Sequence, residues 1–203
     1  MARTLGIHWA ATTHGTWLHG DIRASWLNGR LIAPDPSLEF ACRDLLNDAA
    51  IVLTDDEQQI VANEFGKIVR ERRIRVFAAT IQAIHVHLIF APLRENIKSV
   101  IARFKYRSAA AVLGHRRDGR PAETAGLFSR AVSARRSLWT AGKCPVFIFK
   151  EQHLVNAIEY VRDHNRRDGL APDPFDWTEP LFPVGDFIGE RMIQNTICEV
   201  PPW

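Results

Sequence analysis

Hydrophobic positions along this chain of 203 residues follow two different periods, one typical of strands and one typical of helices. Four runs have strand length and are rich in β-branched and aromatic residues. These runs occupy residues 6–13, 74–82, 83–92 and 137–150. The second and third runs are separated by too little chain for a helix, so together they predict a β-hairpin. In the fourth run, Gly142 and Pro145 indicate a turn or a bulge.

Three other segments place their apolar residues at helical spacing. Residues 53–73 give the clearest signal, because Thr54 and Glu57 can form a capping box at the start of the helix. A second helix is predicted from about residue 95 to residue 113, and a third over residues 151–169.

The order of these elements is strand, helix, strand, strand, helix, strand, helix. This order predicts an α+β fold, a ferredoxin-like split βαβ sandwich whose antiparallel sheet carries helices on one face, with one additional C-terminal helix. Residues 15–46 have no clear period, and we interpret 15–50 as an irregular insertion. Residues 115–126 predict a loop. We therefore expect one domain over 1–178 and a C-terminal tail over 179–203.

The composition is typical of a globular protein, with 46% hydrophobic and 24% charged residues. No stretch approaches the roughly 18 uninterrupted apolar residues of a membrane helix, and the first residues lack the apolar run of a secretory signal. We therefore expect a cytoplasmic protein that has no membrane partner. The three cysteines show no paired spacing, which favours reduced thiols over a disulfide framework or a zinc ribbon.

Positive charge is concentrated in one part of the chain. Residues 94–143 contain twelve Lys or Arg and three Asp or Glu, an excess of nine. Such an excess fits a phosphate backbone, although a solvated basic helix face would look the same. Phe104 and Tyr106 lie among these cations and could stack on bases. The residues that we expect to contact DNA are Arg94, Lys98, Arg103, Lys105, Tyr106, Arg107, Arg116 and Arg117.

Two histidines stand on one face of the predicted strand 83–92. Side chains alternate along a strand, so His85 and His87 share a face, separated by roughly 7 Å of strand. Two imidazoles in this arrangement can converge on one divalent metal ion. An isolated His-x-His pair is nevertheless more often structural, so this interpretation needs further ligands.

The predicted helix 151–169 offers such partners. Four of its apolar residues fall within a stripe about 120° wide, which predicts the buried face. They are Leu154, Val155, Ile158 and Val161. At about 100° per residue, Tyr160 and His164 lie opposite this stripe and one turn apart, where both could face a common site. An exposed tyrosine that packs on its i+4 neighbour is the alternative.

Together these features resemble the HUH single-tyrosine transposases and their REP-associated relatives. His85-Val86-His87 resembles the HUH motif, and AIEYVRDHNRRDGLAPDPFDW is similar to the segment around the family's nucleophilic tyrosine. THGTW at residues 13–17 also resembles a string found in such proteins, and the similarity in order covers most of residues 5–178. The family has Asn or Gln where this chain has His164, and its Asn-Pro is replaced by Asn165-Arg166.

The resemblance implies a metal-dependent endonuclease and strand transferase for single-stranded DNA, with hairpin-containing DNA as the expected partner. Tyr160 would be the nucleophile, forming a 5′-phosphotyrosine and a free 3′-OH. His85 and His87 would bind Mg²⁺ or Mn²⁺ together with His164, with Asn165 as the alternative third ligand. Three imidazoles favour Mn²⁺ over Mg²⁺.

Two alternative functions and one alternative nucleophile account for part of these features. Barrel amidohydrolases also use His-x-His, but they need about 250 residues. A DNA-binding protein that has lost catalysis would keep the basic segment but has no need of His85, His87 and Tyr160. Tyr106, the other tyrosine, has no metal-ligating neighbour to support it as the nucleophile. The sequence leaves open whether the chain acts as a monomer or a homodimer.

Overall fold

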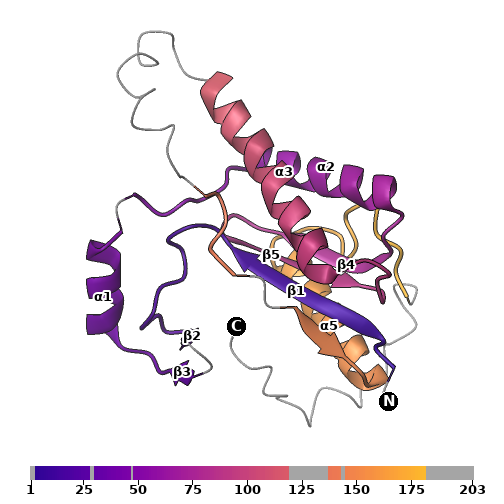
Figure 1. Cartoon of the computed structure of the whole chain (residues 1–203), viewed down its shortest axis with the longest axis horizontal. Helices are drawn as coiled ribbons and strands as arrows, with labels where there is room; N and C mark the ends of the chain where they lie inside the picture. Colours follow the sequence, from indigo (N-terminus) through magenta and orange to yellow (C-terminus); the bar gives the residue numbers. More distant parts are fainter. Residues whose placement is uncertain (1–2, 28–29, 47, 119–136, 143–144, 182–203) are drawn as a thin grey trace. The chain divides into compact units, whose positions relative to one another are not determined.

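The computed structural model describes residues 3–27, 30–46, 48–118, 137–142 and 145–181 (Figure 1). The chain divides into two compact units. The first comprises Met1–His14 and Ile51–Pro180, and the second comprises Gly15–Ala50 and Leu181–Trp203.

A four-stranded sheet forms the centre of the first unit. Its strands are β1 (Gly6–Thr12), β4 (Val76–Ile81), β5 (His85–Phe90) and β6 (Val146–Ile148). They lie in the order β4-β5-β1-β6, and every neighbouring pair is antiparallel. Because β5 lies between β1 and β4, the first βαβ unit is split. The α+β, ferredoxin-like fold expected from the sequence is confirmed.

Three helices accompany this sheet, each close to its predicted place. They are α2 (Asp55–Arg72), α3 (Ile97–Asp118) and α5 (Glu151–Arg167). At the start of α2, the Thr54 side chain accepts a hydrogen bond from the Glu57 amide while the Glu57 carboxylate accepts one from the Thr54 amide. The predicted capping box is therefore confirmed.

One face of the sheet carries the aromatic core beneath α2 and α3. Trp9 of β1 and Phe90 of β5 contact Phe104 of α3, with ring centroids 6.0 and 5.8 Å away, and Phe104 contacts Phe65 of α2 at 4.7 Å. All four rings are fully buried. The expectation that Phe104 could stack on bases is therefore wrong, since its ring is enclosed in the core.

Helix α5 covers the opposite face of the sheet (Figure 1). Its buried residues Leu154, Ile158 and Val161 pack toward β4, β5 and β6. His8, which follows the core-facing Ile7 in β1, points to this second face and contacts α5. The additional helix and the two core helices thus lie on different sides of the same sheet.

The fourth strand is shorter than the sequence suggested. Within residues 137–150, β6 has three residues, and Trp139 makes a separate bridge with Thr13. Gly142 has a φ of +98°, consistent with the expected turn. Most of the predicted 115–126 loop and of the 179–203 tail lies outside the described residues.

The second unit has more regular structure than an irregular insertion. It contains a two-stranded hairpin, β2 (Ser25–Leu27) with β3 (Arg30–Ile32), and the helix α1 (Pro36–Asp44). The Asp35 carboxylate caps α1 by accepting hydrogen bonds from the Ser37 and Leu38 amides.

In the described part of the chain, no helix combines the length and the apolar character needed to cross a membrane.

Glu57 should make the stability of the fold depend on pH. The Arg116 guanidinium, hydrogen-bonded to this buried carboxylate at 2.7 Å, lowers the pKa of Glu57. The ionised group therefore stabilises the fold above its unfolded-state pKa of about 4.3, and this contribution is lost as the pH falls through the lower folded-state pKa.

We expect Glu57→Gln to reduce the free energy of unfolding by about 1–3 kcal/mol at pH 7, because it removes a charge-assisted hydrogen bond. As the pH is lowered from 7 through the depressed folded-state pKa of Glu57, the difference should shrink, because the wild-type carboxylate becomes protonated. Urea unfolding of both proteins across this pH range measures it. A difference that stays constant with pH would contradict the role assigned to the ionised carboxylate.

Candidate active site

The two histidines of β5 lie on the face of the sheet that α5 covers. In the strand register His87 is opposite Ala10 of β1 and Thr80 of β4, and His85 is opposite Thr12. Residues that face each other across antiparallel strands share a side of the sheet. His87 is buried and His85 is half-buried.

Helix α5 brings Tyr160 and His164 to these imidazoles. The His164 ring centroid lies 5.2 Å from that of His85 and 5.3 Å from that of His87. The Tyr160 ring lies 4.7 Å from His164 and 5.5 Å from His87. The sequence-predicted nucleophile and ligand candidates are therefore adjacent in space.

The buried face of α5 includes two polar residues that the sequence did not predict to be buried. The helix buries Arg162 and Asn165 together with Leu154, Ile158 and Val161, whereas Val155 is only half-buried. At about 100° per residue, Arg162 and Asn165 fall inside the predicted stripe, so the buried face lies where the sequence placed it. Tyr160, which is exposed, and His164, which is half-buried, lie outside the buried face, and their rings share one site.

His85, His87 and His164 can converge on one ion. Each offers one ring nitrogen, and the three nitrogens lie within 4.8 Å of one another. The Nε2 atom of His164 is buried and has no hydrogen-bond partner. A buried polar atom without a partner costs free energy unless a ligand uses it, so the donor set fits a divalent metal ion.

The surroundings favour neutral imidazoles. Burial, followed by the charge that His164 carries when protonated, lowers the pKa of His8 to about 4. Burial, followed by the neighbouring histidines, lowers the pKa of His87 well below its ordinary value. Burial and then the charge of Arg167 lower the pKa of His164. At neutral pH these rings are uncharged and have a lone pair available for a metal.

His8 also belongs to the site, although no sequence motif marks it. Its Nε2 atom lies 3.0 Å from Nδ1 of His87, and its ring lies 6.4 Å from that of Tyr160. The available signal was its place in the first strand, where a polar residue alternates with the apolar Ile7 and Trp9. That signal alone does not say which strand lies beside it.

Asn165, the alternative third ligand, uses its side-chain amide in hydrogen bonds to backbone carbonyl groups. Its side chain is fully buried, and Nδ2 donates hydrogen bonds to the carbonyl oxygens of Ala79 at 2.9 Å and Pro172 at 2.8 Å. Rotating the amide would place its oxygen against two carbonyl oxygens, so these contacts fix its orientation. Asn165 thus joins α5 to β4 and to the segment after the helix.

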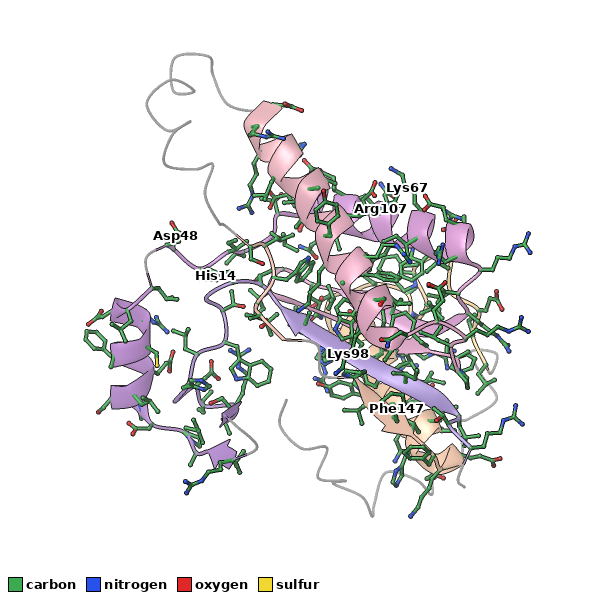
Figure 2. The ribbon with its side chains drawn as sticks, in the orientation of Figure 1. His14, Asp48, Lys67, Lys98, Arg107 and Phe147 are labelled. Atoms are coloured by element: carbon green, nitrogen blue, oxygen red, sulfur yellow. The ribbon has the colours of Figure 1, made fainter. Side chains whose placement is uncertain are left out.

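The basic residues of α3 lie on the side of the sheet away from the histidines. Figure 2 labels Lys98 and Arg107 on this helix. Arg107 pairs with Glu64 and Glu71, and Arg116 pairs with Glu57.

The other cations of this helix are partly engaged as well. Arg103 lies 3.6 Å from Glu95, and Lys105 donates to the carbonyl oxygens of Thr140 and Gly142. Four of the expected DNA contacts are instead exposed. These are Arg94, Lys98, Tyr106 and Arg117.

Comparisons with known proteins give two similar solved structures. The structure of a REP-associated tyrosine transposase bound to a REP hairpin has a TM-score of 0.48 and 10% sequence identity, covering 83% of this chain and 72% of that chain. A putative transposase from Deinococcus radiodurans R1 has a TM-score of 0.42 and 14% identity, covering 80% and 92%. No family model and no curated protein matches the chain. Function must therefore follow from the chemistry of the site.

The neighbours Asn165 and His164 should differ in what they contribute to stability. Asn165→Ala leaves the buried carbonyl of Ala79 and the part-buried carbonyl of Pro172 without this donor, so we expect a loss of about 1–3 kcal/mol in the free energy of unfolding. His164→Ala removes a half-buried ring whose Nε2 has no partner, so we expect less than about 1 kcal/mol. Urea unfolding with a chelator present compares the two. A larger loss for His164→Ala would contradict these positions.

Proposed function

We propose that this protein is a metal-dependent enzyme that cuts and rejoins single-stranded DNA, with Tyr160 as its nucleophile. The observation that carries the proposal is the position of the Tyr160 ring, in contact range of His164 and His87 at the candidate metal centre. Its side chain is 37% exposed, so a phosphodiester can reach the phenol from solvent. A phenol beside a donor set for a divalent ion is suited to phosphoryl transfer.

His85, His87 and His164 would hold the metal ion. A divalent ion bound there acts as a Lewis acid toward a phosphate oxygen. The protein residues provide the remaining chemistry. Because the pKa values of His87 and His164 are lowered, both imidazoles are neutral at neutral pH. Each ring then has one nitrogen lone pair that can bind the ion. The sheet and α5 fix their positions before DNA binds.

In the reaction, the phenol of Tyr160 loses its proton and its oxygen bonds to the phosphorus as the bond to the 3′-oxygen breaks. The 3′-oxygen takes up a proton and leaves as a free 3′-OH, and the 5′-phosphate stays on the tyrosine. One phosphodiester replaces another, so a 3′-OH can reverse the step and join a different strand. No nucleotide cofactor is required for rejoining.

Single-stranded DNA is proposed as the substrate because the motifs around His85, His87 and Tyr160 resemble those of the HUH transposases. Hairpin-containing DNA and a role in transposition follow from the same resemblance. The exposed cations Arg94, Lys98 and Arg117 remain predicted DNA contacts. Arg167, whose charge acts on His164, adds positive charge beside the site itself. An inactive DNA-binding protein is the competing function, and covalent chemistry distinguishes the two.

The Tyr160 proposal predicts a covalent protein–DNA adduct. Wild-type protein, incubated with labelled single-stranded hairpin DNA and Mn²⁺, should give a band that survives denaturation, and Tyr160→Phe should give none because the attacking oxygen is gone. Tyr106→Phe is the matched control and should form the adduct normally, because phenylalanine keeps the ring that could stack on a base and the lost hydroxyl lies on α3, on the other side of the sheet. Adduct formation by Tyr160→Phe would exclude this nucleophile, and DNA binding without any adduct would favour the inactive binder.

The metal centre makes a separate prediction. His164→Ala should weaken metal binding by roughly ten- to a hundredfold, and excess Mn²⁺ should partly restore cleavage. Mn²⁺ should support cleavage at lower concentration than Mg²⁺, because Mg²⁺ prefers oxygen ligands. Metal titrations of wild type, His164→Ala and Asn165→Ala give the comparison. If the Asn165 variant alone, still folded, shows the shifted titration, then Asn165 and not His164 is the ligand.

A further inference from the structure

We propose that His8 is a positioning residue for the candidate metal centre, accepting a hydrogen bond from Nδ1 of His87 and so directing Nε2 of His87 at the ion. This inference rests on the metal site of the proposed function. It concerns a residue that contributes no ligand atom to the cluster of His85, His87 and His164. Its role would be to select the tautomer and the ring orientation of a ligand.

The hydrogen bond between the two rings carries the inference. Nε2 of His8 lies 3.0 Å from Nδ1 of His87, and both side chains are 4% exposed. The contact joins residues 79 positions apart in sequence, on adjacent strands. Strand β1 is paired on both sides, with β5 and β6, so the backbone of His8 is held in place.

The direction of this hydrogen bond decides whether His87 can bind a metal. A neutral imidazole carries one proton. If His8 donates, Nδ1 of His87 is the acceptor, and the proton of His87 sits on Nε2 and blocks that atom. If His87 donates, Nε2 carries a lone pair and can bind the ion. Because Nδ1 faces His8, Nε2 is the atom left for the metal, and ligation requires His8 to accept.

Because the partner of His87 is an imidazole, it also affects the charge at the metal centre. Histidine ligands commonly donate their second N–H to a carboxylate or a carbonyl oxygen, which fixes the tautomer and raises the basicity of the ligand. A neutral imidazole can accept the same hydrogen bond without bringing a negative charge to the site. His8 thus orients His87 while leaving the positive charge of the ion less compensated, which suits an ion that must attract a phosphate oxygen.

Metal binding by the full chain tests the proposal without a reaction. Titration with Mn²⁺ alone, followed by calorimetry, should show that His8→Leu binds roughly ten- to a hundredfold more weakly than wild type, the range for loss of a partner to a ligand. His8→Gln should stay within about threefold of wild type, because its side-chain oxygen can still accept from Nδ1 of His87. His115→Gln, which removes an exposed histidine of α3, is the matched control and should bind as wild type does.

The outcomes separate this inference from the proposed function. If wild type binds Mn²⁺ and His8→Leu binds it equally well, or if His8→Gln is weakened as much as His8→Leu, the positioning role is overturned and the metal site stands. If wild type binds no divalent ion, the proposed function itself fails. Metal binding that responds to His8 as expected, but without a DNA adduct, would leave the positioning role intact and remove the nuclease.

A measurement on the wild-type protein covers the case in which His8→Leu does not fold. Imidazole ¹⁵N NMR of the chain loaded with diamagnetic Zn²⁺ reports which nitrogen of His87 bears the proton. We expect a protonated Nδ1 and a metal-bound Nε2 on His87, with an unprotonated Nε2 on His8. A metal-bound Nδ1 on His87, or a proton on Nε2 of His8, would overturn the proposal.

Discussion

The packing of α5 against the histidine face of the sheet is the constraint on which the site depends. β5 alone presents His85 and His87, but the third imidazole and the phenol come from α5. Burial of three apolar side chains, Leu154, Ile158 and Val161, holds the helix there. At roughly 1.5–3 kcal/mol for each fully buried side chain, this contact stabilises the docked helix by several kcal/mol.

Apolar packing alone would leave the rotation of α5 poorly defined, and buried polar contacts fix it. Arg162, 3% exposed, contacts the carboxylates of Asp173 at 2.8 Å and Glu159 at 2.7 Å. Asn165 donates to Ala79 on β4. These contacts are directional, so they set which residues of the helix face the sheet. Replacing one partner would leave a charge or a carbonyl buried without compensation. The place of Tyr160 thus depends on residues that take no part in chemistry.

The sequence predicted the elements well because their signals are local. Strand alternation placed His85 and His87 on one side, and the capping box located the start of α2. The burial of Arg162 and Asn165 was missed because both side chains are polar, and their burial depends on partners such as Asp173 and Ala79. His8 was missed because only the strand order brings it to His87. Helix α1 was missed although Asp35-Pro36 is a typical helix start, because the helix is only nine residues long and buries none of them.

One face of the sheet carries the aromatic core, and the other face carries the candidate active site. Five buried side-chain polar atoms in the described part of the chain have no hydrogen-bond partner. Three of them, on Thr80, His164 and Asn165, lie on the α5 side, and the other two, on Trp9 and Arg103, lie on the opposite side. Each costs about 1–3 kcal/mol. The opposite face, with Trp9 and its enclosed aromatic neighbours, contributes the packing that offsets this cost. The unpaired polar groups are tolerable because this aromatic packing supplies stability, and an ion bound by the imidazoles would satisfy His164.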